Sequence, residues 1–267
     1  GAPVCGEDAR RILNEMTGQT LHVVTYNIHK GLSLFNRQVM VHELREQLRG
    51  LAPDLVFLQE VQGRNSRRAE AHDNWPREPQ YAFLAEGFWH AAAYGRNAIY
   101  DHGHHGNAIL SRFPIAQAFN QDVTHLRFER RGLLHCMIEI PGAVHPVHCV
   151  CVHLSLFARS RRRQMDALAS YLETIAPSAA PLIVAGDFND WRNEADSLLA
   201  QRLGLREAIG DLQEGMPARS YPARRPMLRL DRIYLRGFAI EHARIHSEPP
   251  WNTLSDHAPL SAHLRPA

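Results

Sequence analysis

The chain has 267 residues, of which 45% are hydrophobic and 22% charged, a composition typical of globular proteins that excludes a mainly disordered chain. Thirty Lys and Arg residues oppose 28 Asp and Glu, so the formal net charge of +2 lacks the strongly basic balance of a dedicated nucleic-acid-binding domain. No run approaches the ~18 consecutive apolar residues of a membrane-spanning helix. Residues 1–20 lack the apolar core of a signal peptide, so we expect a cytoplasmic protein, with a signal removed before Gly1 as the alternative.

Arginine dominates the basic residues, and Lys30 is the only lysine. The planar guanidinium suits phosphate recognition, while biased codon usage explains the same pattern without a functional role. The four cysteines, Cys5, Cys136, Cys149 and Cys151, form no disulfide framework and lack the paired spacing of a zinc site. We therefore expect free thiols in a reducing compartment.

Eight short apolar runs rich in β-branched residues predict buried strands. In chain order they cover residues 21–28, 54–61, 107–111, 133–140, 147–154, 182–185, 230–235 and 259–264. Amphipathic patterns predict three helices, one capped by Asn36 and running to about Leu48, the others at 159–175 and 194–203. The runs at 133–140 and 147–154 are typical of a hairpin, which argues against a purely parallel sheet. We predict an α+β fold with mixed or antiparallel sheets and helices outside, as one domain over residues 21–267 after an N-terminal extension of residues 1–20.

Polar side chains stand where four of these apolar runs end. Asn27, Glu60 and His153 each lie at the end of a run, and Asp187 and Asn189 follow the run at 182–185. A buried carboxylate is costly unless it is paired, hydrogen-bonded or bound to a metal. Together the endings predict one polar site at a shared sheet edge, although each alone is also typical of a turn that ends a strand.

Two further polar segments lie near the C-terminus. Asp231 stands inside the apolar run "RLDRIYL", and Asp256 and His257 are adjacent in "SDHAPL". A histidine paired with a buried carboxylate can act as a general base, because the carboxylate fixes its tautomer and stabilises its cation. On its own, an Asp-His pair is more typical of a turn than of a catalytic site.

Seven motifs, in this order, resemble the endonuclease/exonuclease/phosphatase superfamily, whose members include deoxyribonuclease I. They are "TYNIH" at 25–29, "LQEV" at 58–61, "GNAILSR" at 106–112, "VHLS" at 152–155, "GDFND" at 186–190, "RLDRIYL" at 229–235 and "SDHAPL" at 255–260. The resemblance covers about residues 21–264. The segments "NIHKG", "AYGRN" and "GHHGNAILSR" are similar to small bacterial members without an assigned substrate.

The resemblance implies a four-layer α/β sandwich, in which two mixed sheets pack face to face with helices outside. It also implies hydrolysis of a phosphate ester assisted by Mg²⁺ or Mn²⁺. Glu60 would be the main metal ligand, with Asn27 and Asp256 beside it, a donor set that suits a hard cation.

The same resemblance implies catalytic roles. Asp187 and Asn189 would position the attacking water. His257, oriented by Asp231, would be the general base or a cation that stabilises phosphate, and His153 would be the opposing general acid or a phosphate ligand. Which histidine takes the proton, and whether one or two metals act, stays open. Abasic-site endonucleases usually carry Tyr where His153 stands, so a dedicated abasic-site enzyme is disfavoured.

Five further residues are candidates for binding substrate phosphate: His29, Asn107, Arg112, Arg161 and Arg162. His29 shares strand parity with Asn27, and a structural histidine explains it equally well. The two arginines after His153 are also typical of the solvated start of an amphipathic helix. A further cluster, His102, His104 and His105, indicates either a transition-metal site or a loop at the rim of the active site.

These observations predict a monomeric, metal-dependent phosphodiesterase, and we expect a nuclease that acts on DNA or RNA. The alternative is a phosphodiesterase or phosphatase that acts on a phospholipid headgroup, an inositol phosphate or another small phosphate ester. A binding module on an inactive scaffold is disfavoured, because every catalytic position that the resemblance implies is filled. The fold and the metal chemistry do not identify the substrate.

Overall fold

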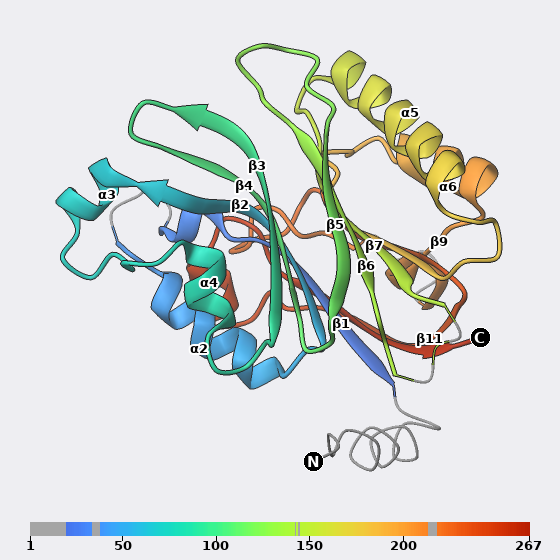
Figure 1. Cartoon of the computed structure of the whole chain (residues 1–267), viewed down its shortest axis with the longest axis horizontal. Helices are drawn as coiled ribbons and strands as arrows, with labels where there is room; N and C mark the ends of the chain where they lie inside the picture. The colour runs from blue at the N-terminus through green and yellow to red at the C-terminus, as the bar shows by residue number, and fades with distance from the viewer. Residues whose placement is uncertain (1–19, 34–37, 142, 144, 213–217) are drawn as a thin grey trace, which may run out of the picture.

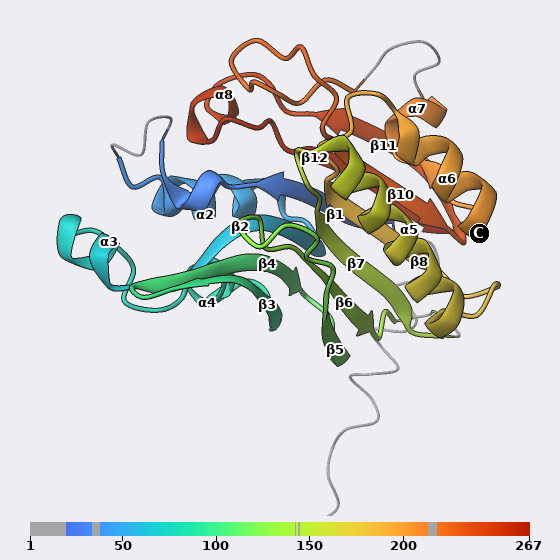
Figure 2. The same cartoon turned by 90° about the horizontal axis from the view of Figure 1, so that it is seen from above.

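Two six-stranded β-sheets pack face to face in the computed structural model, and helices cover both outer faces (Figures 1 and 2). The structure describes residues 20–33, 38–141, 143, 145–212 and 218–267. The first sheet has the strand order β11-β12-β1-β2-β4-β3, and the second has the order β5-β6-β7-β8-β10-β9. Both sheets are mixed, because β1 and β2 are parallel, as are β7 and β8, while their other neighbours run antiparallel.

The strands and helices follow the chain with the following bounds. The strands are β1 (Leu21–Asn27), β2 (Leu55–Asn65), β3 (Ala91–Tyr100), β4 (Gly103–Ser111), β5 (Ile115–Asp122), β6 (Gly132–Ile138), β7 (Val147–His153), β8 (Leu182–Asp187), β9 (Arg206–Glu207), β10 (Asp231–Arg236), β11 (Phe238–Ile245) and β12 (Leu260–Pro266). The helices are the single turn η1 (His29–Gly31), α2 (Val41–Leu51), α3 (Ser66–Ala71), α4 (Gln80–Ala85), α5 (Ala158–Ile175), α6 (Glu194–Leu203), α7 (Ala208–Leu212) and α8 (Trp251–Leu254).

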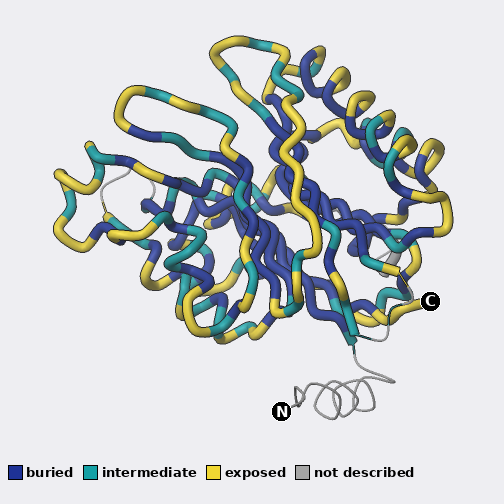
Figure 3. The backbone as a smooth tube through the Cα atoms, viewed as in Figure 1, coloured by how far each residue is buried: buried dark blue, intermediate teal, exposed yellow. Residues whose placement is uncertain are grey.

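Three hydrophobic clusters separate the four layers. One lies between the two sheets and includes Phe57 and Ile233. The second joins the first sheet to α2, α4 and α8, and the third joins the second sheet to α5 and α6. Figure 3 shows the resulting gradient, with buried strands at the centre and exposed residues along the outer sides of the helices. The predicted four-layer sandwich is therefore confirmed.

The central strands read as continuous apolar runs because both of their faces are covered. All seven residues of β1 are buried, and so are all seven of β7. This is why the sequence pattern located these strands well. The eight predicted runs correspond to β1, β2, β4, β6, β7, β8, β10 and β12, and the β6–β7 hairpin is present.

The sequence prediction missed β3, β5, β9 and β11 and misplaced one helix start. The edge strand β5 is exposed along nearly its whole length, so it carries no apolar signal. The first helix begins at Val41 rather than after Asn36, which itself lies outside the described residues. Cys136, Cys149 and Cys151 are buried free thiols, and Cys5 lies outside the described residues. Within the described part of the chain, no helix is both long and apolar enough to cross a bilayer.

Strand direction decides where the polar strand ends meet. The carboxyl ends of the parallel strands β1 and β2 lie at one end of the first sheet. The ends of β7 and β8 lie at one end of the second sheet, where the antiparallel strand β10 begins. Because the two sheets are stacked, these ends come together and carry the site described next.

Candidate active site

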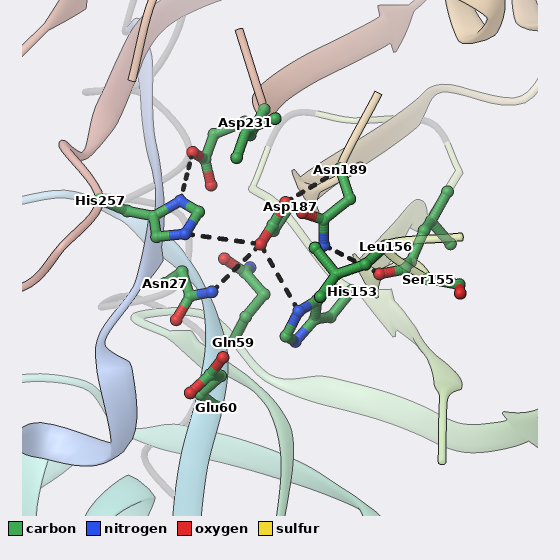
Figure 4. A network of polar contacts seen from close by, with 12 residues as sticks. Asn27, Gln59, Glu60, His153, Ser155, Leu156, Asp187, Asn189, Asp231 and His257 are labelled. Atoms are coloured by element: carbon green, nitrogen blue, oxygen red, sulfur yellow. Dashed lines mark hydrogen bonds and ion pairs between the residues drawn. The ribbon is translucent and has the colours of Figure 1, made fainter. Parts of the chain in front are cut away.

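Three residues of the second sheet form a row across adjacent strands. His153 on β7 and Asp231 on β10 are both register partners of Asp187 on β8, so the three side chains share one face of the sheet. The Nε2 atom of His153 lies 3.5 Å from Oδ2 of Asp187. All three residues are buried, and Figure 4 shows Asp187 at the centre of the row.

His257 completes this group from the loop before β12. Its Nδ1 donates a hydrogen bond of 2.8 Å to Asp231 Oδ2, and its Nε2 lies 3.7 Å from Asp187 Oδ2. Burial alone would lower the pKa of His257, but the carboxylates of Asp231 and Asp187 raise it to about 10. The imidazole is therefore a cation at neutral pH. Burial raises the pKa of the Asp187 carboxyl, and the neighbouring Asp231 carboxylate raises it further.

Two asparagines fix the orientation of Asp187. Asn27 donates from Nδ2 to Oδ2 of Asp187 at 3.1 Å, and the backbone N–H of Asn189 donates to Oδ1 at 2.9 Å. Asn189 adopts a left-handed conformation with φ of 49°, and its side chain donates to the carbonyl of Leu154 at 3.0 Å. Asp187 Oδ2 is thus approached by Asn27, His153 and His257, which come from different segments of the chain (Figure 4).

A bulge in β2 presents Glu60 to the same region. The pairing of β2 with β4 shifts register between Leu58 and Val61, and Glu60 has φ of 58°. The side chain of the buried Gln59 donates from Nε2 to the carbonyl of Phe57 at 3.0 Å. The bulge turns the next residue, Glu60, toward Asn27 (Figure 4). Left-handed conformations cost free energy in residues other than glycine, and they concentrate at functional sites.

A positive charge lies next to the Glu60 carboxylate. Burial disfavours the charge of this carboxylate, but Lys30 is the strongest of the groups that lower the pKa of Glu60 to about 2. The Nζ atom of Lys30 lies 3.4 Å from Glu60 Oε2. That oxygen is buried and has no hydrogen-bond partner. A desolvated, ionised oxygen without a donor is a suitable ligand for a cation.

The short turn η1 follows β1 and faces Asp256 as well as Glu60. His29 Nδ1 lies 3.4 Å from Asp256 Oδ2, and the His29 N–H donates to Oδ1 of Asn27 at 3.1 Å. Asn27 therefore offers its amide oxygen toward the side of His29 and its amide nitrogen toward Asp187. It connects the group around Glu60 and Asp256 with the group around Asp187.

Three residues of this cluster have a spacing that a metal ion could use, but only with His257 deprotonated, because an imidazolium has no free lone pair for a metal. Asp187, Asp231 and His257 offer ligand atoms that lie within 4.8 Å of one another, and all three residues are buried. In the described chain this is the one group of three or more such residues that meets this spacing. His102, His104 and His105 do not converge. His104 bonds to the hydroxyl of Tyr94 at 3.0 Å instead, and His102 packs against Tyr100.

Four of the predicted phosphate-binding residues lie elsewhere or are already engaged. Arg112 follows β4 at the opposite end of the sheet, where Nη1 lies 3.5 Å from Asp54. Arg161 is fully buried and donates to the carbonyls of Ser155 and Leu156. Asn107 on β4 donates to the carbonyls of Gly132 and Cys151 in the other sheet. Arg162 is exposed and forms an ion pair with Glu194.

Sequence reasoning missed two features of the site. Lys30 had a visible signal, because it is the only lysine and lies three residues after Asn27. The second is a clamp on the loop after His153, in which Glu129 accepts from the Leu156 N–H at 3.1 Å and from the Ser155 hydroxyl, and pairs with Arg131. Glu129 is more than twenty positions from Ser155 and Leu156 in the chain, so no local pattern revealed the clamp.

The four-layer sandwich thus carries a buried cluster of Asp, Asn and His side chains at its strand ends, an arrangement suited to hydrolysis of a phosphoester. A model of the "Endonuclease/Exonuclease/phosphatase family" matches residues 24–257, and the chain belongs to that family. It is 44% identical over 242 residues to "Uncharacterized protein YbhP" of Escherichia coli strain K12. The aligned region covers 91% of this chain and 95% of YbhP.

Two solved structures share the fold at low sequence identity. The human Nocturnin catalytic domain with bound sulfate anion superposes with a TM-score of 0.73 and 19% identity, over 94% of this chain and 95% of that chain. D. rerio TDP2 complexed with single strand DNA product gives a TM-score of 0.65 and 18% identity, over 92% of this chain and 99% of that chain. At these identities the likeness supports the fold alone.

Proposed function

We propose that the protein hydrolyses phosphodiester bonds with Mg²⁺ or Mn²⁺ and that its substrate is DNA or RNA. The observation that carries the proposal is the convergence of Asn27, His153 and His257 on one oxygen of Asp187. Such a cluster can hold a water and a phosphate oxygen at the same time, as in-line attack at phosphorus requires.

The metal would be held by Glu60, with Asn27 and Asp256 as further oxygen ligands. The fit rests on Glu60 Oε2, which is buried, ionised and without a hydrogen-bond donor. When bound there, a divalent cation would neutralise charge on the phosphate and polarise it toward attack. Mg²⁺ retains several waters and binds through few carboxylates, which agrees with so small a donor set.

Side chains of the cluster supply the remaining steps, which are positioning the water, accepting its proton and binding the phosphate. Asp187 and Asn189 orient the attacking water, and Asp187 is the group that accepts its proton, because burial raises the pKa of this carboxyl. His257, a cation held by Asp231, offsets negative charge on a phosphate oxygen. Burial, with a contribution from Arg131, lowers the pKa of His153 well below its usual value, so this imidazole is neutral and binds phosphate through hydrogen bonding.

An apolar tip beside His153 supports a polymeric substrate. The tip consists of Phe128, Leu156 and Phe157, whose exposed fractions are 76%, 55% and 52%. The rings of Phe128 and Phe157 contact each other edge to face at 6.0 Å. Arg127, Arg130 and Arg159 are exposed around the tip, without an ion pair to any described residue. Aromatic rings with adjacent arginines are typical of surfaces that bind single-stranded nucleic acid. The structure of D. rerio TDP2 contains a single strand DNA product.

The same apolar tip favours a second candidate function, hydrolysis of a phospholipid headgroup. Leu156 offers no ring for base stacking, and protruding apolar side chains surrounded by arginines also suit the surface of an anionic membrane. The two functions differ in what the tip contacts. They make the same demands on the catalytic cluster.

The first experiment is a substrate panel with Mg²⁺, Mn²⁺ or EDTA. Plasmid DNA, single-stranded DNA, RNA, phospholipid vesicles and a small chromogenic phosphodiester are tested with the wild type, Glu60→Gln and His257→Gln. We expect metal-dependent cleavage of nucleic acid that both substitutions abolish. Arg112→Gln is the matched control and retains activity, because Arg112 lies at the opposite end of the sheet. Full activity in Glu60→Gln would contradict the assigned site.

The apolar tip is then tested by itself. Phe128→Ser should weaken binding of a single-stranded oligonucleotide and leave turnover of the small phosphodiester unchanged, because the catalytic cluster is intact. Tight binding and turnover of anionic vesicles, with nucleic acids inert, would replace the nuclease proposal by the phospholipid one.

A further inference from the structure

Lys30 has an unusual position for the only lysine of the chain. It lies in η1, directly after the strand that carries Asn27, and its ammonium group is 3.4 Å from Glu60 Oε2. His29 and Lys30 have φ of 45° and 60°, and Gly31 continues the left-handed stretch with φ of 68°. Two consecutive non-glycine residues in this region are costly.

The surrounding structure holds this turn in its strained conformation. Gln80 Nε2 donates to the Lys30 carbonyl at 2.8 Å, and Asn27 Oδ1 accepts from the His29 N–H. Gly31 has a φ of 68°, and a Cβ atom there would lie 2.4 Å from Gln80 Nε2, so another residue would be strained and would displace the Gln80 amide from its bond to Lys30. Strain that is enforced by several contacts points to a function of the groups that the turn presents.

The contact between Lys30 and Glu60 is suited to exchange. The Glu60 oxygen that faces the ammonium has no hydrogen bond, although the two groups carry opposite charges at short distance. The Lys30 side chain is about one third exposed, so its end can move toward solvent without breaking core packing. Lysine is a compact charge on a flexible stem, whereas arginine would bind the carboxylate in a fixed, bidentate geometry.

We propose that Lys30 neutralises Glu60 in the metal-free protein and becomes a phosphate-binding residue when a divalent cation takes its place at that carboxylate. The inference rests on the proposed function, because it takes Glu60 as the metal ligand. An ammonium group and a divalent cation repel each other at one carboxylate. A substrate phosphate between them removes this repulsion, so metal and phosphate binding are coupled through Lys30.

The first test measures metal affinity without substrate. Isothermal titration of metal-free protein with Mn²⁺ is carried out on the wild type, Lys30→Met and Arg112→Met. We expect Lys30→Met to bind Mn²⁺ at least about fivefold more tightly, which is the lower range of coupling between two sites. Arg112→Met removes one positive charge at the opposite end of the sheet, so its affinity should equal that of the wild type. Unchanged or weaker Mn²⁺ binding by Lys30→Met would overturn the proposal.

The second test measures the coupling with inorganic phosphate as the probe. Wild-type protein saturated with Mn²⁺ should bind phosphate more tightly than metal-free protein. Lys30→Met should lose most of that gain, and Lys30→Arg should retain phosphate binding because a cation remains. If Lys30 only contacts Glu60, phosphate binding should be the same in Lys30→Met and the wild type. That result would overturn the proposal that Lys30 binds phosphate.

Thermal unfolding separates this inference from the proposed function. Without metal, Lys30→Met should unfold at lower temperature than the wild type, because Glu60 keeps an uncompensated buried charge. Added Mn²⁺ should raise its unfolding temperature more than that of the wild type. If the wild type binds no Mn²⁺, the metal assignment itself fails. If the wild type binds Mn²⁺ and Glu60→Gln does not, while Lys30→Met matches the wild type, only the inference on Lys30 fails.

Discussion

His257 Nδ1 donates a hydrogen bond of 2.8 Å to Asp231 Oδ2, and both residues are buried. The contact decides which imidazole nitrogen faces the cluster, because Nδ1 is occupied and Nε2 is left toward Asp187. It also stabilises the imidazolium, since the Asp231 carboxylate is among the charges that raise the pKa of His257 to about 10. The pair therefore fixes both the orientation and the charge of His257.

Asp231→Asn should remove the negative charge that faces His257 and keep the size and shape of the side chain. The pKa of His257 should fall from about 10, so its imidazolium is lost at lower pH than in the wild type. Proton NMR titration of His257 in metal-free protein measures this change directly. Phosphodiesterase activity at neutral pH should fall about a hundredfold or more. Asp101→Asn, at an exposed carboxylate, is the control and should titrate and react like the wild type. An unchanged His257 titration in Asp231→Asn would contradict the assignment.

Arg161 is predicted to stabilise the fold rather than to bind phosphate. Its guanidinium is fully buried, 3.9 Å from the buried Asp190 and 4.6 Å from the Trp191 ring centre. Arg161→Met leaves Asp190 without this charge partner and should lower the free energy of unfolding by about 3 kcal/mol. Arg162→Met removes an exposed ion pair with Glu194 and should cost at most about 1 kcal/mol. Urea unfolding measures both, and equal losses would refute the distinction.

Asn107 is predicted to hold the two sheets together near the site. Its buried amide donates to Gly132 O at 3.0 Å and to Cys151 O at 3.2 Å, and both acceptors belong to the second sheet. Asn107→Ala removes both of these buried hydrogen bonds between the sheets and should destabilise the protein by about 2 kcal/mol. Asn120→Ala, at an exposed position, should change the free energy of unfolding by less than about 0.5 kcal/mol. Chemical denaturation that gave the same midpoint for both variants would contradict this role.

The sequence located the strands and the strand ends because burial on both faces leaves a strong local pattern. Asp187 illustrates this, since an apolar run leads directly to it and the structure places it at the centre of the cluster. Glu60 was found by the same signal, but its presentation depends on a bulge and a left-handed backbone that no propensity indicates.

Two of the phosphate-binding candidates come from one motif but lie in different parts of the structure. Asn107 and Arg112 belong to one segment, "GNAILSR". An extended strand rises about 3.3 Å per residue, so five residues separate them by about 17 Å. One end of the motif therefore lies near the site and the other at the opposite end of the sheet. Lys30 was overlooked because it follows the strand rather than ending it. A tight turn, which the apolar pattern does not indicate, brings it to Glu60.

Buried histidines away from the site should make the protein less stable in mild acid. His135 Nε2 and His148 Nδ1 are 3.1 Å apart, so one ring nitrogen must accept from the other. Burial, and to a lesser extent His148, lowers the pKa of His135 to about 4. An unfolded histidine titrates near pH 6.5. Between these values the unfolded chain holds a proton that the folded chain does not, so the free energy of unfolding decreases as the pH falls from 6.5 toward 4.

His135→Gln should reduce this acid sensitivity. Between pH 7 and pH 5 the wild type should lose on the order of 1 kcal/mol more than His135→Gln. The variant still loses some stability, because burial also lowers the pKa of His22 to about 4. His145→Gln, at an exposed histidine, should keep the full sensitivity of the wild type. Urea unfolding at the two pH values measures the difference, and an identical loss in all three proteins would show that His135 takes up its proton in the folded state.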